Sequence, residues 1–310
     1  MYDTVHFWID KADIPGGNPL GILPYLSNET EHNSENRGSS YSGTIENILV
    51  HVFEAGISLK GSLAKYYFGN NVEMLTRKDT QRAIEKLSEA LHIDIRKAKV
   101  RRLDVAMIVY TQRPPADYYS YLGQKSRFLR LQATDNTLYY NTKKKQLIFY
   151  NKTKEAKEVY PNDFEDDCYY ALRYELRFLK RLREQLKTDV TGAMLYNFIF
   201  YYRCLLFLKT EFNSIAKINK LGIGTDGITT PHEAKEALFA RLLQEKGQTA
   251  ITDFLSDLKA ANALHDKKAY SRLKSSLNKI IAAPSAQKSS PIQELETGVE
   301  TTIKCVQSMM

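Results

Sequence analysis

The sequence predicts an α+β fold, with an antiparallel-sheet domain over residues 1–187 followed by an α-helical domain over residues 188–282. In the first part, short segments alternate apolar and polar side chains and are separated by stretches rich in Gly, Asn and Ser. From about residue 188 onward, apolar residues recur at the period of a helix. A chain of 310 residues is long enough for two domains that each bury their own core.

The alternating segments of the first domain are predicted to be strands. They cover residues 4–9, 45–53, 61–68, 100–110, 137–140, 146–150 and 170–178. Residues 141–145 join two of them as a hairpin, whereas residues 27–42, rich in Ser, Asn, Glu and Gly, are predicted to be a loop. A helix is predicted after Thr76, which can cap its N-terminus, because the apolar residues over 83–91 follow a helical period.

Helices account for most of the remaining predicted structure. They cover residues 118–123 and 179–187 in the first domain and residues 194–212, 231–243, 249–263 and 267–281 in the second. Residues 249–281 permit a helix-turn-helix reader of DNA, but no glycine marks its turn, so a plain packing bundle is favoured. Residues 283–310 are rich in Ser, Pro and Gln, and we predict a disordered tail there.

The composition favours a polyanionic partner and the cytoplasm. Lysine and arginine outnumber aspartate and glutamate by 44 to 36, which gives a formal net charge of +8. Three widely spaced cysteines, Cys168, Cys204 and Cys305, form no Cys-x-x-Cys pair, so neither a zinc ribbon nor a disulfide framework is expected. No basic leader and no long uninterrupted apolar run is present, so we expect no membrane association.

Basic residues cluster around the predicted strands, with tyrosines interleaved. This combination can hold single-stranded nucleic acid through phosphate contacts and base stacking. An ordinary solvated surface is the alternative interpretation, because lysine-rich turns are common. The residues that we expect to contact DNA are Lys65, Arg102, Lys143, Lys144, Lys145, Lys154, Arg173 and Arg177.

Two strands carry acidic residues beside arginines. Residues 102–104 read Arg-Leu-Asp and residues 173–177 read Arg-Tyr-Glu-Leu-Arg, and side chains two positions apart point to the same face of a strand. Asp104 and Glu175 can therefore converge on a divalent cation, which prefers oxygen ligands. Cross-strand salt bridges are the alternative, and from these residues alone they are the more ordinary outcome.

Tyr150 and Lys152 share one face of another predicted strand. A tyrosine can attack a phosphodiester and form a covalent phosphotyrosine if a metal ion polarises the phosphate and a nearby cation stabilises the phenolate. Lys152 can supply that cation. The alternative is that Tyr150 only packs, since the chain contains 20 tyrosines.

Four short motifs occur in a fixed order along the chain. The first motif combines SLAK at residues 62–65 with GNN at 69–71. The others are RLDVA at 102–106, LIFYNK at 147–152 with Glu155 after it, and RYELR at 173–177. This succession resembles the gene II/X family of phage and plasmid rolling-circle replication initiators, which includes the nicking protein of filamentous phages. The resemblance covers about residues 60–187.

The resemblance implies a nicking-and-joining endonuclease with a sheet domain similar to the histidine-hydrophobic-histidine nuclease fold. Tyr150 would cut one strand of origin DNA, stay attached to the 5′ phosphate and leave a 3′ hydroxyl for a polymerase. By position in the motifs, Asp104, Glu175 and Glu155 would bind Mg²⁺ or Mn²⁺, and Lys152 would steady the phosphate. Single-stranded origin DNA, a host helicase and a host polymerase are the implied partners.

The chain departs from the family's pattern at the histidines. Asn70 stands where family members can carry histidine, so an amide oxygen would have to replace a possible metal ligand. No His-x-His pair occurs among the six histidines, which leaves carboxylates as the main candidate ligands. Two alternatives remain: a DNA-binding regulator that kept the fold without nuclease activity, and a conjugative relaxase with the same chemistry.

Overall fold

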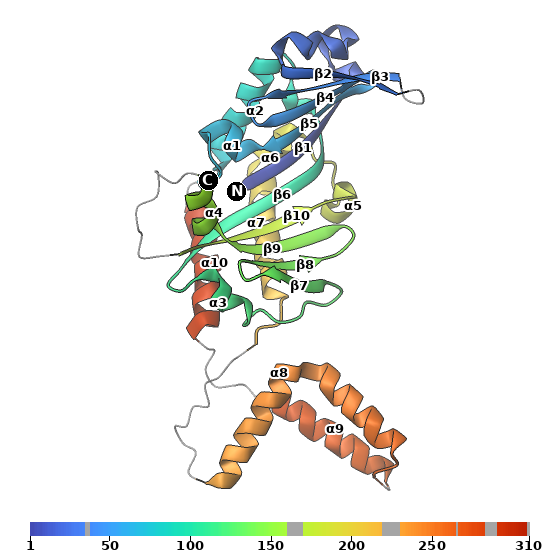
Figure 1. The fold of residues 1–310 in the computed structure, drawn as a ribbon, viewed down its shortest axis with the longest axis vertical. Helices are drawn as coiled ribbons and strands as arrows, with labels where there is room; N and C mark the ends of the chain where they lie inside the picture. Colours follow the sequence, from blue (N-terminus) through green and yellow to red (C-terminus); the bar gives the residue numbers. More distant parts are fainter. Residues whose placement is uncertain (35–37, 160–169, 219–229, 265, 283–289, 309–310) are drawn as a thin grey trace. The chain divides into compact units, whose positions relative to one another are not determined.

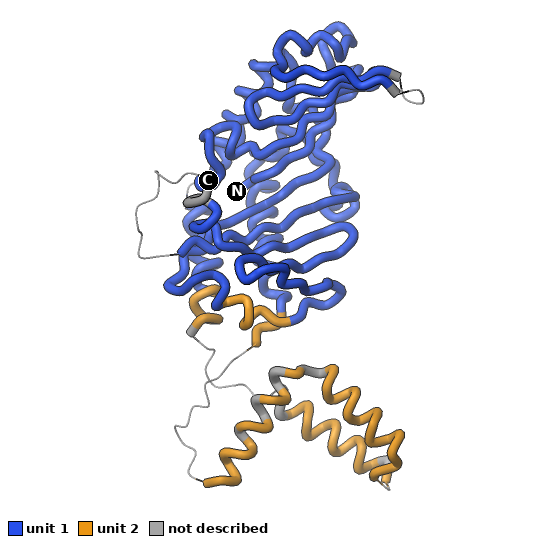
Figure 2. The backbone as a smooth tube through the Cα atoms, viewed as in Figure 1, with its two compact units in different colours: residues 1–117, 124–215, 297–310 blue, residues 118–123, 216–296 orange. Residues whose placement is uncertain are grey.

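A ten-stranded antiparallel sheet is the central feature of the structure, a computed structural model (Figure 1). The structure describes all residues except 35–37, 160–169, 219–229, 265, 283–289 and 309–310. The chain divides into two units (Figure 2). Unit 1 comprises residues 1–117, 124–215 and 297–310 and contains the sheet, whereas unit 2 comprises residues 118–123 and 216–296.

The order of strands in the sheet is β2-β3-β4-β5-β1-β6-β10-β9-β8-β7. The strands are β1 (Tyr2–Asp10), β2 (Ser27–Ser34), β3 (Gly38–Ile45), β4 (Ile48–Phe53), β5 (Gly56–Ser62), β6 (Lys99–Thr111), β7 (Leu129–Thr134), β8 (Thr137–Asn141), β9 (Lys145–Asn151) and β10 (Tyr170–Phe178). The predicted α+β class with an antiparallel sheet is thereby confirmed. β6 and β10, far apart in sequence, pair over nine residues at the centre.

Short helical segments surround the sheet in unit 1. The α-helices are α1 (Leu63–Phe68), α2 (Arg77–Leu91), α4 (Lys152–Val159), α5 (Leu182–Leu186), α6 (Gly192–Leu195) and α7 (Phe198–Asn213), and the 3-10 helices are η1 (Lys11–Asp13), η2 (Pro15–Gly17), η3 (Pro19–Tyr25) and η4 (Ile95–Lys97). α3 (Pro115–Tyr119) and α10 (Ser290–Ser308) span the division between the units. α2 begins where predicted, because Thr76 and Asp79 form a capping box.

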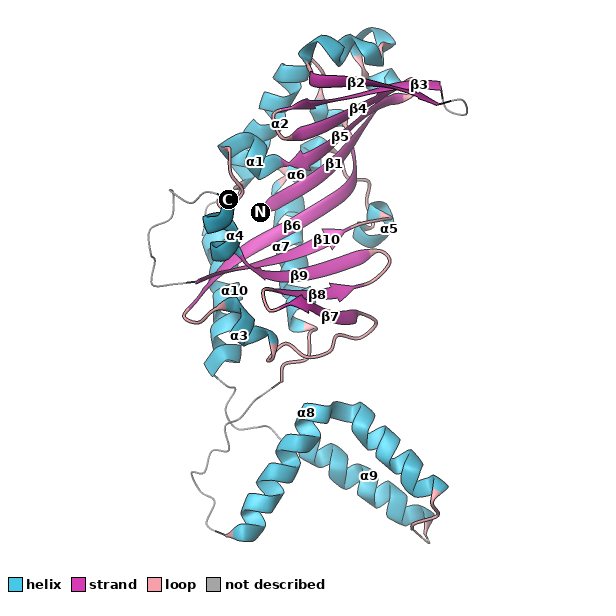
Figure 3. Cartoon of the chain, in the orientation of Figure 1, coloured by secondary structure: helices cyan, strands magenta, loops and turns pink. Residues whose placement is uncertain are grey.

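The two faces of the sheet differ in polarity. One face carries the buried apolar residues of the alternating strands and is covered by α7, which runs behind β6, β10 and β9 in Figure 3. On this side the rings of Phe149 and Tyr174 stack with centroids 4.5 Å apart, and the Tyr174 hydroxyl donates to the carbonyl of Leu208 on α7 over 3.1 Å. The opposite face, called the open face below, carries polar and charged side chains.

Two predictions of local structure in unit 1 were wrong. Residues 27–42 were predicted to be a loop, but residues 27–34 form β2 and residues 38–42 form most of β3, which pair at the edge of the sheet; residues 35–37 lie outside the described residues. These two strands are polar on both faces, so they lack the alternation that marks a half-buried strand. Residues 63–68, predicted to continue a strand, form α1, because Ser62 Oγ accepts a hydrogen bond from the Lys65 amide and Gly69 ends the helix with a left-handed conformation.

Part of the expected disordered tail, residues 283–310, is ordered, while residues 283–289 and 309–310 lie outside the described residues. Residues 290–308 form α10, whose Val299, Ile303 and Val306 are buried. Thr302 Oγ1 donates to the carbonyl of Ile108 on β6 over 3.1 Å. The Ser and Gln content suggested disorder, but the apolar residues recur every three to four positions, which is the pattern of an amphipathic helix.

A substitution at Gly298 tests this packing of α10. A Cβ atom at this position would lie 2.3 Å from Cγ1 of Val109. We therefore expect Gly298→Val to lower the free energy of unfolding by about 1–3 kcal/mol, because the added methyls overpack the contact with β6. Urea unfolding monitored by circular dichroism measures it. Gly21→Val is the control, since a Cβ there meets only an asparagine side-chain nitrogen at 4.0 Å; equal stability losses would contradict the contact.

Unit 2 contains the helices α8 (Pro231–Ala260) and α9 (Lys267–Ala282). α8 begins with the predicted Thr230-Pro231 N-terminus and joins two segments predicted as separate helices. Its buried Ile251 and Leu255 pack in a small core with Leu277 of α9. The predicted boundary at residue 187 also differs from the observed division, because α7 belongs to the sheet unit. Within the described ranges, none of the helices has the length and hydropathy needed to span a bilayer.

Candidate active site

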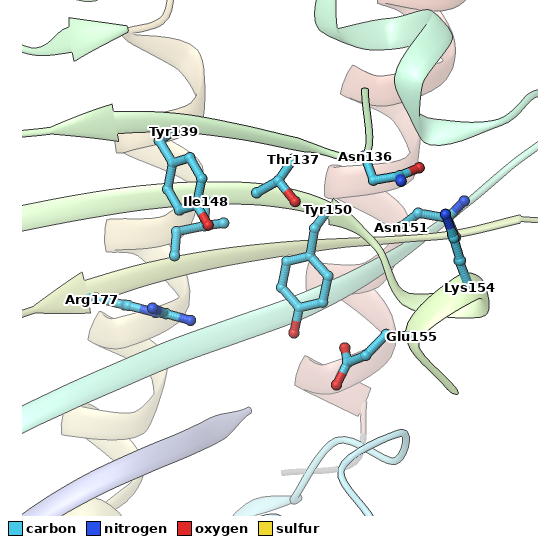
Figure 4. A pocket seen from close by; sticks show the side chains of 9 residues that line it. All are labelled: Asn136, Thr137, Tyr139, Ile148, Tyr150, Asn151, Lys154, Glu155 and Arg177. Carbon is cyan, nitrogen blue, oxygen red and sulfur yellow. The ribbon is translucent and has the colours of Figure 1, made fainter. Parts of the chain in front are cut away.

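Tyr150 lies on the open face, on strand β9, with its hydroxyl directed toward β10 (Figure 4). Strand alternation buries its neighbour Phe149 on the covered face and leaves Tyr150 on the opposite side. The Tyr150 hydroxyl donates a hydrogen bond of 2.8 Å to Oε1 of Glu175. A cavity of about 400 Å³ opens beside it, lined by Asn136, Thr137, Tyr139, Ile148, Tyr150, Asn151, Lys154, Glu155 and Arg177. The phenol is therefore held by a carboxylate at the wall of a cavity.

Glu175 is the centre of a charged cluster on β10. It is 0% exposed. Its Oε1 accepts from Nε of Arg173 over 2.9 Å, and its Oε2 accepts from Nε and Nη2 of Arg177 over 2.9 and 2.8 Å. Burial by itself raises the pKa of Glu175, but the charges of the two arginines, with hydrogen bonds from Arg177 and Tyr150, outweigh it and lower the pKa. Glu175 is therefore ionised at neutral pH and accepts the Tyr150 proton in a hydrogen bond.

Tyr150 itself is neutral in this arrangement. Burial raises the pKa of its phenol well above the ordinary value, the charge of Arg173 opposes that shift, and the negative charge of Glu175 adds to it. A phenolate at this position consequently requires additional positive charge or a proton acceptor at the moment of reaction. Glu175 occupies the position of that acceptor.

Asp104 lies beside this cluster on the neighbouring strand β6, where it pairs in register with Arg177. It accepts from Nε and Nη2 of Arg102 over 3.0 and 2.7 Å, and its Oδ2 lies 3.7 Å from Nε of Arg177. Arg177 thus bridges Asp104 and Glu175. Burial raises the pKa of Asp104 to about 6, although Arg102 and Arg177 act to lower it.

The raised pKa of Asp104 predicts a pH dependence of stability. The folded state holds its proton more tightly than the unfolded state, so this group's contribution falls as pH rises from about 4 to about 6 and is constant above that window. We expect the unfolding free energy of the original chain, relative to Asp104→Asn, to fall by about 3 kcal/mol across this window. Urea unfolding at a series of pH values measures it, and a difference that does not change with pH would contradict the assignment.

Lys152 and Glu155, in the first turn of α4, form a second part of the cluster. Nζ of Lys152, which is 1% exposed, donates to Oδ1 of Asn71 over 2.8 Å and to Oε2 of Glu155 over 2.9 Å. Burial lowers the pKa of Lys152, while its bond with Glu155 opposes that shift. Arg173 connects this group to Glu175, since its Nη1 donates to the carbonyl of Asn71 over 2.7 Å.

Sequence reasoning missed two residues of this cluster. Asp3 Oδ2 lies 3.4 Å from Nη2 of Arg173, and Asp3 Oδ1 accepts from Ser62 Oγ over 2.7 Å. Asn71, rather than Asn70, reaches Lys152, because Asn70 Oδ1 accepts from the amide of Val72 in its own turn. Neither residue shares a strand with Glu175. Asn71 lies in the GNN motif at residues 69–71, but within that motif only Asn70 was considered as a candidate, and no local pattern marks Asp3.

The expected DNA contacts fall into two groups. Arg102, Arg173 and Arg177 belong to the charged cluster, and Lys154 lines the cavity. Lys144, in the β8–β9 turn, and Lys145, at the start of β9, instead form ion pairs with Glu184 and Glu211. Lys143, in the same turn, and Lys65, on α1, are exposed. The roles of these residues in binding DNA stay predictions.

The described carboxylates do not form a set of metal ligands. Each oxygen of Asp104 and Glu175 accepts a hydrogen bond from a guanidinium group, and Glu155 is paired with Lys152. Over the described ranges, no three His, Cys, Asp or Glu side chains lie together as a metal site would require. The arrangement therefore does not fit a bound divalent cation as it stands. A requirement for Mg²⁺ or Mn²⁺ stays a prediction.

Comparison with known proteins identifies the family. The family model for the N-terminal part of the replication-associated protein encoded by phage gene II matches residues 1–198, which contain the whole sheet, α7's first residue and every residue of the charged cluster. No curated protein matches the chain. The match covers well over half of the 310 residues and extends the resemblance of residues 60–187 to the N-terminus. The chain therefore belongs to the family of gene II replication proteins of filamentous phages, which implies a part in starting rolling-circle replication.

Proposed function

We propose that this protein nicks and rejoins one strand of DNA at a replication origin through a covalent intermediate on Tyr150. The observation that supports it best is the 2.8 Å hydrogen bond from the Tyr150 hydroxyl to the ionised Glu175 at the wall of an open cavity. Family membership supports the reaction class, and the hydrogen bond supports the choice of nucleophile.

The proposed chemistry is a transesterification. Tyr150 Oη attacks the phosphorus while its proton passes to Glu175, and a new bond forms between the phenolic oxygen and phosphorus. The bond from phosphorus to the 3′ oxygen breaks, and that oxygen takes a proton from a solvent water to become a free 3′ hydroxyl, while Glu175 returns the tyrosine's proton to solvent. The 5′ phosphate stays on the tyrosine. Joining is the same reaction in reverse, so the two steps conserve protons and phosphodiester bonds.

The arginines have a defined part in this proposal. Charge builds on the nonbridging phosphate oxygens in the transition state, and guanidinium groups stabilise it through bidentate hydrogen bonds. Arg177 borders the cavity and its side chain is 29% exposed, so it can reach a phosphate there. Arg173 is 4% exposed in its side chain and acts instead by positioning Glu175.

The protein's partners follow from the reaction. Single-stranded origin DNA is the substrate, and the free 3′ hydroxyl would serve a polymerase, with a helicase needed to unwind the duplex ahead of it. Two further functions remain as alternatives: a regulator of this fold that binds DNA without cutting it, and a conjugative relaxase that uses the same chemistry.

An adduct assay tests the proposed function. The full chain is incubated with single-stranded circular DNA carrying a filamentous-phage origin, with Mn²⁺ and, in parallel, with EDTA. We expect a denaturant-resistant protein–DNA adduct, located at Tyr150 by mass spectrometry of the digested product. Binding without any adduct would support the regulator and overturn the proposal. Equal adduct formation in EDTA would overturn the predicted metal requirement alone.

A further inference from the structure

A second group of aromatic and basic side chains lies on the open face, away from Tyr150. Trp8 on β1 is partly exposed, and the guanidinium carbon of Arg101 on β6 lies 4.0 Å from the centre of its ring. Phe53 on β4, 39% exposed, has its ring centroid 6.1 Å from that of Trp8. Figure 1 shows β4, β5, β1 and β6 side by side, so these side chains form one patch, called the Trp8 patch below.

The backbone builds this patch in a defined way. The register between β1 and β6 shifts so that His6 pairs with Arg102 and Phe7 with Val100, which leaves Arg101 as an extra residue in a β-bulge. The bulge places Arg101 and Arg102 in succession on the open side. Gly56 leaves room for the indole, since a Cβ atom there would lie 3.2 Å from Cζ2 of Trp8.

The Trp8 ring is held in place before any ligand binds. Its Nε1 donates to Oδ1 of Asp10 over 2.7 Å, and Asp10 also pairs with Lys99. The guanidinium of Arg101 stacks on the indole and is otherwise exposed to solvent. A planar guanidinium on an aromatic ring is a surface on which nucleobases stack. Such preorganisation reduces the entropy cost of binding.

Two exposed cations, Arg101 and Lys60, lie on the strands on either side of Trp8. Among the described residues, neither Arg101 nor Lys60 forms an ion pair, and both are exposed. His6 lies between them, and burial followed by the charges of Arg101, Lys60 and Arg102 lowers its pKa. These two cations can pair with the phosphates of a nucleic acid.

We propose that the Trp8 patch is a stacking subsite for single-stranded DNA that flanks the nick. The substrate class rests on the proposed function. Glu175, which accepts the hydrogen bond from Tyr150, pairs with Ala106 on β6, and Trp8 pairs with Lys99 near the start of the same strand β6. At the rise per residue of a strand, the patch therefore lies roughly 25 Å from the Tyr150 hydroxyl across the open face. A strand with the 3.4 Å spacing of B-form DNA covers that distance in about seven nucleotides, and an extended strand needs fewer.

Fluorescence gives a direct test, because Trp8 is the sole tryptophan of the chain. Tyr150→Phe protein is titrated with thymidine homopolymers of about 4 to about 16 nucleotides. We expect the longer strands to quench Trp8 fluorescence and to bind more tightly than the shortest. Arg101→Ala should weaken binding about 5- to 100-fold, and Arg101→Lys, which keeps the charge without the plane, should also weaken it. No quenching, or full affinity in Arg101→Lys, overturns the stacking subsite.

Two comparisons separate this proposal from its alternatives. Arg96→Ala removes the same charge at an exposed arginine paired with Asp94, and it should change affinity by less than about twofold. Duplex DNA that quenches Trp8 better than a single strand would overturn the choice of ligand. An adduct at Tyr150 in the original chain without quenching removes the subsite and leaves the nicking function. Quenching without an adduct supports the subsite and overturns the nicking function.

Discussion

The variant Tyr150→Phe should form no covalent adduct with origin DNA, and its rate of nicking should fall by at least about 10⁴-fold. The substitution removes the oxygen that would bond to phosphorus and keeps the aromatic ring. It also removes the hydrogen bond to Glu175, so the free energy of unfolding should change by only about 1 kcal/mol. A labelled strand resolved on a denaturing gel measures both the adduct and the nick.

Tyr139→Phe is the matched control for this prediction. Tyr139 lines the same cavity from β8 and loses the same hydroxyl, but among the described hydrogen bonds it makes none to Glu175. Adduct formation should therefore be retained in Tyr139→Phe. An adduct that survives in Tyr150→Phe would show that another residue is the nucleophile, and mapping the adduct would then locate it.

The substitution Glu175→Gln should affect both stability and activity. Glu175 neutralises Arg173 and Arg177 in a buried cluster, and removing its charge leaves the buried guanidinium of Arg173 with much weaker compensation. We expect the free energy of unfolding to fall by about 3–5 kcal/mol. The rate of nicking by the folded fraction should fall a further 10²- to 10⁴-fold, roughly, because the proton acceptor of Tyr150 is lost.

Two variants separate the structural and chemical contributions of Glu175. Glu184→Gln removes an exposed carboxylate paired with Lys144 and Arg181, and it should cost less than about 1 kcal/mol. Glu175→Asp keeps the charge but withdraws it from the Tyr150 hydroxyl by one methylene. A folded Glu175→Asp protein that nicks at the full rate would contradict a role for Glu175 as the base.

The central sheet was predictable because apolar and polar residues alternate along several of its strands. Alternation identified β6, β8, β9 and β10, although the charged cluster on the open face is itself buried, so long runs of β6 and β10 are buried on both faces. β7 was not predicted, because five of its six residues are exposed and the sixth is only partly buried. Composition misled the prediction for α10, where the spacing of Ile292, Leu295, Val299 and Ile303 carried the correct information.

The candidate site was predictable to the extent that strand geometry determines it. Residues two apart share a face, so Arg102 with Asp104, and Arg173 with Glu175 and Arg177, were placed correctly on one side. Pairing across strands was not predictable, and it decides the chemistry. The salt-bridge alternative describes the observed contacts of Asp104, and the hydrogen bond from Tyr150 to Glu175 depends on a register that no local motif encodes.

The pairing of β6 with β10 has a consequence for how the protein acquires activity. Asp104 is on β6 and Glu175 on β10, and the strands β7, β8 and β9 lie between them in the sequence. The cluster therefore forms only after these distant segments have paired. A chain interrupted before residue 170 retains Tyr150 but has neither Glu175 nor the two arginines that hold it. Under the proposed function, chains that end before residue 170 should form no adduct with origin DNA.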